Sequence, residues 1–127
     1  MKNLKIPNTP KTPGINFNSS SGNFSISGIS VPENSKGFYE PIITWLKEYV
    51  KFPRESTKIE FKLSYVNTSS LQFIYDLLML LDGLNCDSSK VSVDWFHLEE
   101  DIDMQEMGED FREAINVEFN FFTVENV

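Results

Sequence analysis

The sequence contains a single cysteine and a single histidine, and this scarcity excludes several kinds of site. Cys86 alone cannot form an intramolecular disulfide, and Cys86 with His97 supplies too few ligands for a Cys/His zinc site. No Gly-rich phosphate-binding loop is present, because Gly22, Gly28 and Gly37 have the wrong spacing and context. We therefore expect neither a metal ion nor a cofactor.

Long apolar runs and basic side chains are also scarce. No stretch of about 18 apolar residues occurs and no charged-then-apolar leader opens the chain, so we expect a cytoplasmic protein without membrane insertion. Lys and Arg together number 11 against 19 Asp and Glu, which gives a formal net charge of -8. Nucleic-acid binding depends on neutralising phosphates with basic side chains, so this charge argues against it and favours protein partners.

Carboxylates are concentrated late in the chain, in the run Glu99–Asp103 and on the helical pattern that follows. This run lacks the spacing and the glycine turn of a calcium loop, and we interpret it as a solvated helix face. Paired carboxylates are compatible with acid–base catalysis, but no nucleophile–base pattern accompanies them. A small carboxylate-dependent enzyme is therefore the weaker alternative.

Five segments alternate apolar and polar residues with a period of two, and each has one apolar face. They lie near residues 15–17, 24–26, 59–65, 91–95 and 117–121, with Tyr65 on the apolar side of its segment. Sheets covered on both faces read as continuous apolar runs, so this pattern predicts helices on one face and water on the other. Phe96 and Phe122 fall on the solvent-facing side of the sheet, where we expect the termini or a partner to cover them.

Three helical patterns lie between these strands, at about 34–51, 68–84 and 101–115. The predicted order is ββαβαβαβ, and the predicted fold class is α/β of a two-layer, α+β-like kind, with a mixed sheet of about five strands and three helices on one face. Residues 1–14 are rich in proline and are predicted to be a flexible arm, which leaves residues 15–127 as one domain.

Four small polar residues, Asn67 to Ser70, stand where the third strand pattern gives way to the second helix. On a helical wheel, Ser70 falls within the apolar arc, Ser69 lies near the edge of that arc, and Thr68 lies almost opposite to it. Thr68 is thus the hydroxyl predicted to be exposed. It heads a row with Gln72, Tyr75 and Met79, and Asp76 lies beside this row.

Two interpretations of the exposed hydroxyl remain open. In the first, Asn67, Thr68 or Ser69 only caps the helix, which contributes about 1 kcal/mol. Alternatively, Thr68 is a phosphoacceptor: a phosphate adds about -1.5 to -2 charges, and the free N–H groups at a helix N-terminus tolerate such a charge.

Three stretches together resemble the SiaC-like family of bacterial regulatory phosphoproteins. They are VPENSKGFYEPIITWL (Val31–Leu46), LSYVNTSS (Leu63–Ser70) and VSVDWFHLEEDIDMQEMGEDF (Val91–Phe111), and the resemblance covers about Thr12 to Phe121. It implies a small non-catalytic switch with the logic and fold of anti-sigma-factor antagonists (STAS domains). By the motif NTSS, the family's phosphothreonine corresponds to Thr68.

The resemblance also implies partners. A serine/threonine kinase of the SiaB type would phosphorylate the protein and a PP2C-type phosphatase would restore it. The unphosphorylated form would bind and activate a diguanylate cyclase, raising cyclic di-GMP and favouring biofilm formation, and phosphorylation would release the cyclase. A constitutive, unphosphorylated adaptor and a structural subunit are the alternatives.

We hypothesise that partner contacts surround Thr68. The candidate contact residues are Asn67, Ser69, Gln72, Tyr75, Asp76 and Met79. Tyr39 is added because tyrosine can place its hydroxyl at the surface while its ring packs, and such residues are enriched at protein interfaces.

Overall fold

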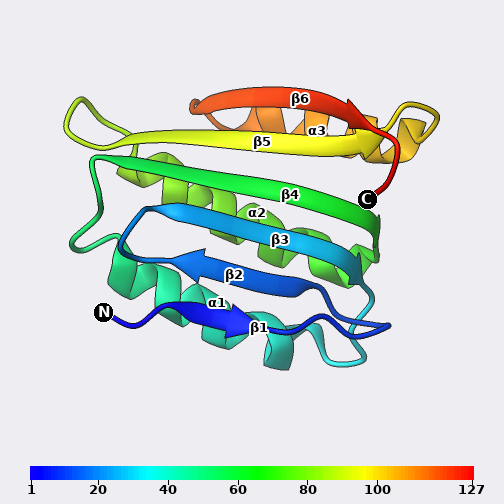
Figure 1. Ribbon diagram of the computed structural model, residues 1–127, viewed down its shortest axis with the longest axis horizontal. Coiled ribbons are helices and arrows are strands. Elements are labelled where there is room, and N and C mark those ends of the chain that lie inside the picture. The colour runs from blue at the N-terminus through cyan, green and yellow to red at the C-terminus, as the bar shows by residue number, and fades with distance from the viewer.

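The computed structural model describes residues 1–127, which form one six-stranded mixed sheet with three helices (Figure 1). In chain order the elements are β1 (Leu4–Ile6), β2 (Gly14–Asn18), β3 (Asn23–Ser30), α1 (Ser35–Tyr49), β4 (Ser56–Val66), α2 (Thr68–Leu84), β5 (Lys90–Leu98), α3 (Ile102–Ala114) and β6 (Glu118–Val124).

The strands lie side by side in the order in which the chain makes them, β1-β2-β3-β4-β5-β6. β1, β2 and β3 pair antiparallel, whereas β3 to β6 are parallel and are joined through the helices. Crossovers between parallel strands are right-handed, so three successive crossovers in one direction place all three helices on the same face. Figure 1 shows the helices behind the sheet and no element in front of it. The predicted two-layer α/β fold is confirmed.

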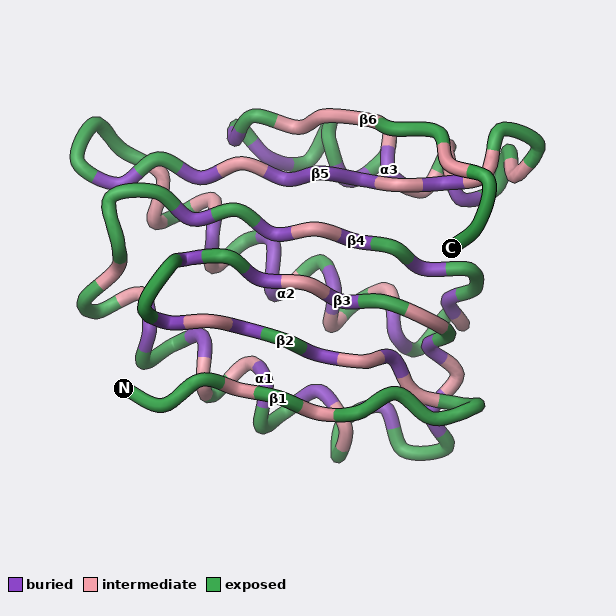
Figure 2. Tube along the Cα trace, in the orientation of Figure 1, coloured by how far each residue is buried: buried purple, intermediate pink, exposed green.

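The core lies between the sheet and the helices, and buried positions alternate along the central strands (Figure 2). Inward residues of β4 and β5 meet the apolar arc of α2, where Ile74, Leu77 and Leu78 are fully buried. Trp95 anchors α3 because its Nε1 donates a hydrogen bond to the backbone oxygen of Met104 at 2.9 Å. The apolar faces that the sequence predicts for the strands and for the helices therefore pack against each other in one layer.

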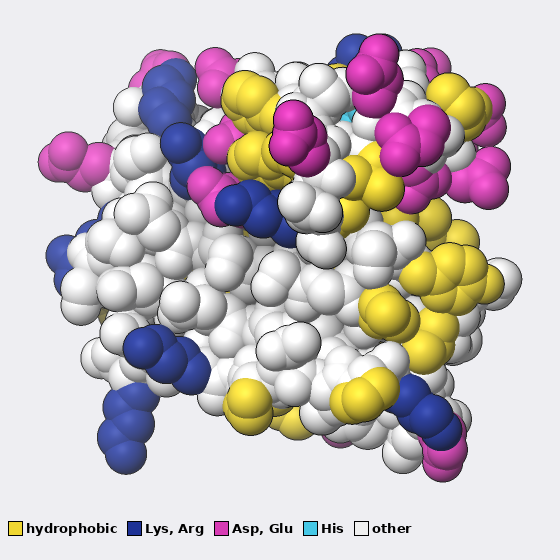
Figure 3. All heavy atoms as spheres, turned by 45° about the vertical axis from the view of Figure 1, so that its right-hand side comes forward, with side chains coloured by type: hydrophobic (Ala, Val, Ile, Leu, Met, Phe, Trp, Pro, Cys, Tyr) yellow, Lys and Arg dark blue, Asp and Glu magenta, His cyan; other side chains and the backbone are white.

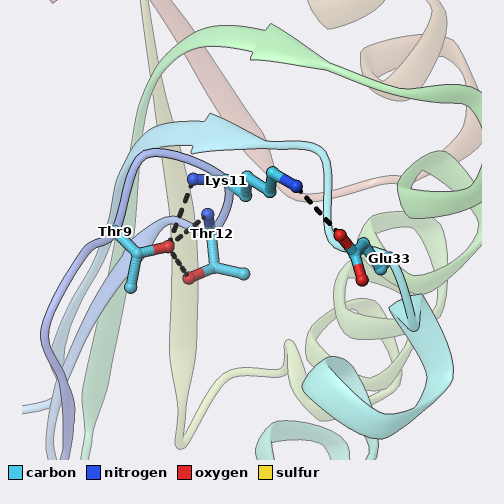
Figure 4. A network of polar contacts seen from close by, with 4 residues as sticks. All are labelled: Thr9, Lys11, Thr12 and Glu33. Carbon is cyan, nitrogen blue, oxygen red and sulfur yellow. Dashed lines mark hydrogen bonds and ion pairs between the residues drawn. The ribbon is translucent and has the colours of Figure 1, made fainter.

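The structure corrects the predicted N-terminal arm. Leu4–Ile6 forms an additional edge strand paired with β2, so the sheet has six strands instead of about five. The segment that follows β1 is also held by polar contacts (Figure 4): Thr12 N donates to Thr9 Oγ1 at 2.9 Å, and Lys11 Nζ lies 2.9 Å from Glu33 Oε1. Prolines break this segment into short pieces without detaching it from the sheet.

A second correction concerns the end of β4. Leu63 pairs with Gly28 and Tyr65 pairs with Ile29, so Ser64 is an extra residue at a break in the β3–β4 register. The extra residue reverses the alternation beyond it, because one added residue turns every later side chain to the other face. Tyr65, expected to face the core, is 58% exposed on the open face, and Val66 is buried instead. Gly28, at a φ of 110°, occupies the conformation that the irregularity requires.

None of the three helices combines the length and the hydrophobicity needed to cross a lipid bilayer.

We predict that Gly108→Ala destabilises the protein by about 1–3 kcal/mol, because an added Cβ overpacks a closed contact. That Cβ would lie 2.6 Å from Trp95 Cδ1 and 2.7 Å from Phe121 Cε1. The free energy of unfolding in urea measures the effect.

The matched control is Gly83→Ala in α2, where an added Cβ meets nothing within 4 Å. Its free energy of unfolding should stay the same or rise by up to about 1 kcal/mol, as expected for alanine in a helix. Equal losses in the two variants would contradict the tight packing of α3 on Trp95.

Candidate functional site

The residues Asn67 to Ser70 lie at the carboxyl end of the sheet, where β4 passes directly into α2. Asn67 has an extended conformation, and its Oδ1 accepts a hydrogen bond from the backbone N–H of Ser70 at 3.0 Å. This is the geometry of a helix N-cap. Among the capping residues that the sequence left open, Asn67 is therefore the cap, and Thr68 is the first helical residue.

Ser70 points inward, as the helical wheel predicts. It is fully buried, and its Oγ accepts a hydrogen bond from Ser30 Oγ at 2.9 Å. Ser30 Oγ in turn lies 2.6 Å from the hydroxyl of Tyr39, which is also fully buried. This buried trio of hydroxyls joins the end of β3, the first turns of α1 and the start of α2.

Ser69 is also engaged, but nearer the surface. Its Oγ lies 2.6 Å from Ser35 Oγ and 3.3 Å from Asn67 Oδ1. Ser35 is the first residue of α1, so this contact ties the starts of α1 and α2 together.

Thr68 differs from both of its hydroxyl neighbours. Its side chain is exposed, and its Oγ1 makes no hydrogen bond within the protein. The row predicted beside it is exposed as well: Tyr75 and Met79 are at the surface, and Gln72 Nε2 donates to Asp76 Oδ1 at 2.9 Å. A hydroxyl that is accessible and free of internal bonds sits at the start of this exposed row.

Tyr39 does not belong to the exposed surface, and its predicted role as a partner contact is wrong for this conformation. Its ring packs in parallel with that of Phe73 at 5.5 Å, and its hydroxyl is enclosed by Ser30. Burial raises the pKa of the Tyr39 hydroxyl, and hydrogen bonds with Ser30 and Ser70 oppose this shift. Tyr39 is a structural support beneath the site.

Sequence reasoning missed Ser30 and Ser35. Ser30 continues the inward alternation of Phe24 and Ile26, and Ser35 directly follows the N-cap Asn34. The alternation of β3 and the position after the N-cap are both visible in the sequence. Only the tertiary arrangement, however, brings these two hydroxyls against the start of α2.

The side chains that an enzyme would need are not gathered at Thr68. The groove between α2 and α3, about 320 Å³, is lined by Asp103, Glu106 and Asp110 with apolar neighbours, and His97 is absent from it. His97 is buried, and its Nδ1 lies 2.8 Å from the backbone oxygen of Leu98. A separate cavity of about 670 Å³ lies around Trp45 and Arg54 and includes none of residues 67–70.

The model of the SiaC family regulatory phosphoproteins matches residues 6–124. The chain belongs to the SiaC family of regulatory phosphoproteins. The expected family is thus confirmed, and the function is regulatory rather than catalytic.

Similar proteins agree with this assignment in sequence, and solved structures agree with it in fold. An uncharacterized protein of Pseudomonas aeruginosa (strain UCBPP-PA14) is 31% identical over 119 residues, which are 94% of each chain. The crystal structure of apo-SiaC from Pseudomonas aeruginosa is 30% identical with a TM-score of 0.88, covering 95% of this chain and 98% of that one. SiaC is also solved in complex with the diguanylate cyclase SiaD, which it activates; that match is 30% identical with a TM-score of 0.89 and covers 95% and 99%.

We predict that Ser70→Ala and Thr68→Ala differ sharply in their effect on stability. Removing the Ser70 hydroxyl leaves buried Ser30 without one partner and should lower the free energy of unfolding by about 1–2 kcal/mol. Removing the exposed Thr68 hydroxyl should change it by no more than about 0.5 kcal/mol. Urea unfolding of the two variants measures both, and equal losses would mean that the Thr68 hydroxyl is structural.

The raised pKa of Tyr39 predicts a stability loss in alkali. A group whose pKa is raised by folding stabilises the folded protein below its ordinary pKa of about 10, and this stabilisation is lost as pH rises through the folded-state pKa. The free energy of unfolding should therefore fall more steeply above about pH 10 in the wild type than in Tyr39→Phe. Parallel pH profiles would show that Tyr39 is not the group responsible.

Proposed function

We propose that Thr68 is the regulatory phosphorylation site and that its modification switches the binding of a diguanylate cyclase. The unphosphorylated protein binds and activates the cyclase, and phosphorylation releases it. The observation that carries this proposal is the exposed Thr68 hydroxyl, which is free of internal hydrogen bonds while Ser69 and Ser70 are both engaged.

The start of α2 suits a phosphate. The first turn of the helix contains no acidic residue, so its free N–H groups and positive dipole end are not yet balanced by a carboxylate. A phosphate on Thr68 would add about -1.5 to -2 charges at that position. Because the supporting hydroxyls of Ser70 and Ser30 lie beneath it, the modified protein keeps its fold.

The phosphate would lower the affinity of a partner docked beside Thr68. We assign the partner contact to the docking stripe on α2. It consists of Gln72, Tyr75, Asp76 and Met79, with Asn67 and Ser69 at its N-terminal end. A partner covering this stripe would remove water from the phosphate, which is costly for an unpaired charge. A switch from nearly all bound to nearly all free requires about 5.5 kcal/mol of differential affinity, which such desolvation can largely supply.

The cyclase is proposed from the relative. SiaC of Pseudomonas aeruginosa is the activator in its complex with SiaD, and the two SiaC-family chains match over almost their whole lengths. Reversible control further requires a kinase of the SiaB type and a PP2C-type phosphatase. The proposal includes a cytoplasmic location, where these enzymes find their nucleotides and metal ions, and an output through cyclic di-GMP on biofilm formation.

The test compares Thr68→Ala and Thr68→Asp with the wild type in binding and activating the diguanylate cyclase of the same organism. Thr68→Ala should bind constitutively, and Thr68→Asp should lose at least about tenfold in affinity, because a carboxylate carries only part of the charge of a phosphate. Calorimetry measures binding, and cyclic di-GMP synthesis measures activation.

Thr44→Asp is the matched control, since Thr44 is an exposed threonine of α1 away from the docking stripe. It should bind like the wild type. Intact-mass analysis of protein from native cells should show one phosphate on wild type and none on Thr68→Ala. If Thr68→Asp binds and activates as well as wild type, or if the phosphate maps elsewhere, the proposed switch is wrong.

A further inference from the structure

The open face of the sheet, opposite the helices, has two chemically different halves. At the amino ends of the parallel strands it is polar and its groups are paired: Lys58 Nζ lies 3.6 Å from Asp94 Oδ2, and Asn120 Nδ2 donates to Asp94 Oδ1 at 3.2 Å and to Glu118 Oε2 at 3.1 Å. The polar groups of this half thus have partners within the protein, and Asp94 is buried among them.

The half at the carboxyl ends of the strands is apolar. We call it the open-face patch, and it consists of Ile29, Tyr65, Phe96, Leu98, Phe122 and Val124. Pairing places Ile29 beside Tyr65, Phe96 beside Phe122, and Leu98 beside Val124. Tyr65 is 58% exposed and Phe122 is 43% exposed. Figure 3 shows hydrophobic side chains gathered over this end of the sheet.

The patch is ordered without a partner. The rings of Phe96 and Phe122 stack at 5.0 Å, and Lys62 Nζ lies 4.7 Å above the Phe96 ring. The break in the β3–β4 register turns Tyr65 outward onto the same face. Apolar residues on both faces of a strand are typical of sheets that have helices on both faces, and here no element of the chain supplies the second layer.

Acidic side chains border the patch. Glu99 and Glu100 follow Leu98 at the end of β5, and Glu125 follows Val124 at the end of β6; none of the three has an ion-pair partner. Figure 3 shows acidic side chains beside the hydrophobic ones. A second copy of the chain would bring the same carboxylates against them, so self-association is electrostatically disfavoured. The complementary surface is apolar with a basic border.

We propose that the open-face patch is the docking surface for an amphipathic helix of a partner protein, with an apolar stripe flanked by Lys and Arg. A helix is the element that covers a sheet face of this width, as α2 and α3 do on the opposite side. The apolar stripe packs on Tyr65, Phe96 and Phe122, and the basic flanks meet Glu99, Glu100 and Glu125. This surface is distinct from the docking stripe on α2, and the proposal holds whichever effector the protein regulates.

The closing experiment uses the full chain and two synthetic helical peptides of roughly 18 residues, or about five turns. One has a leucine stripe flanked by lysine, and the other has the same stripe flanked by glutamate. Backbone amide NMR shifts map the bound surface, and calorimetry measures affinity. The Leu/Lys peptide should bind with shifts centred on the ends of β4, β5 and β6, and the Leu/Glu peptide should bind at least about tenfold more weakly.

Tyr65→Ser and Phe122→Ser should each weaken the Leu/Lys peptide by about tenfold or more, the loss expected when a large apolar contact is removed. Phe52→Ser is the matched control, because Phe52 is 88% exposed and lies after α1, outside the patch. The variant Glu99→Lys with Glu100→Lys, whose apolar contacts are intact, should reverse the preference between the peptides even if a serine variant folds poorly.

Shifts centred on α2, equal binding of the two peptides, or no binding would overturn the proposal. So would a wild-type dimer in light scattering that Phe122→Ser converts to a monomer, since a second copy would then occupy the patch. Loss of the cyclase response in Thr68 variants bears only on the phosphorylation switch, so the two proposals fail by different measurements.

Discussion

The side chain of Asn67 caps helix α2 by accepting a hydrogen bond from the backbone N–H of Ser70, and the rest of the site is arranged around this start of the helix. The buried arc of Ile74, Leu77, Leu78 and Leu81 sets the rotational phase of α2 on the sheet, and the advance of about 100° per residue then places Thr68 outward and Ser70 inward. The buried contact from Ser30 to Ser70 holds the same phase from the other side. The apolar arc, the cap and the buried hydroxyl together leave Thr68 as the residue of NTSS whose hydroxyl is exposed and free of internal hydrogen bonds.

This arrangement would allow Thr68 to be modified, as proposed, without disturbing the fold. Ser70 and Ser69 are used inside the protein, where they tie α2 to β3 and α1, and Thr68 is left outside. A charge added outside a satisfied buried network does not unpair any group within it, which is the condition for altering binding without unfolding. The three hydroxyls at this junction therefore have different roles: those of Ser69 and Ser70 are structural, and that of Thr68 is accessible.

Local periodicity allowed much of the fold and of this site to be predicted from the sequence. The α2 wheel placed Thr68 outside and Ser70 inside because a long, strongly apolar helix has only one stable orientation on a sheet. The features that were not predicted depend on contacts between residues that are far apart in the sequence. Tyr65 turned outward because of an extra residue opposite Gly28, and Leu4–Ile6 joined the sheet through β2. Tyr39 was buried by hydroxyl partners that no local pattern connects.

Successive right-handed crossovers also explain why the two proposed surfaces lie close together. They place every helix on one face and start each helix at the carboxyl ends of the strands, so Thr68 and the open-face patch share that end of the molecule. Tyr65 and Thr68 are three residues apart, on opposite sides of the turn from β4 to α2. A single partner that spans the turn from β4 to α2 would therefore contact both the docking stripe and the open-face patch.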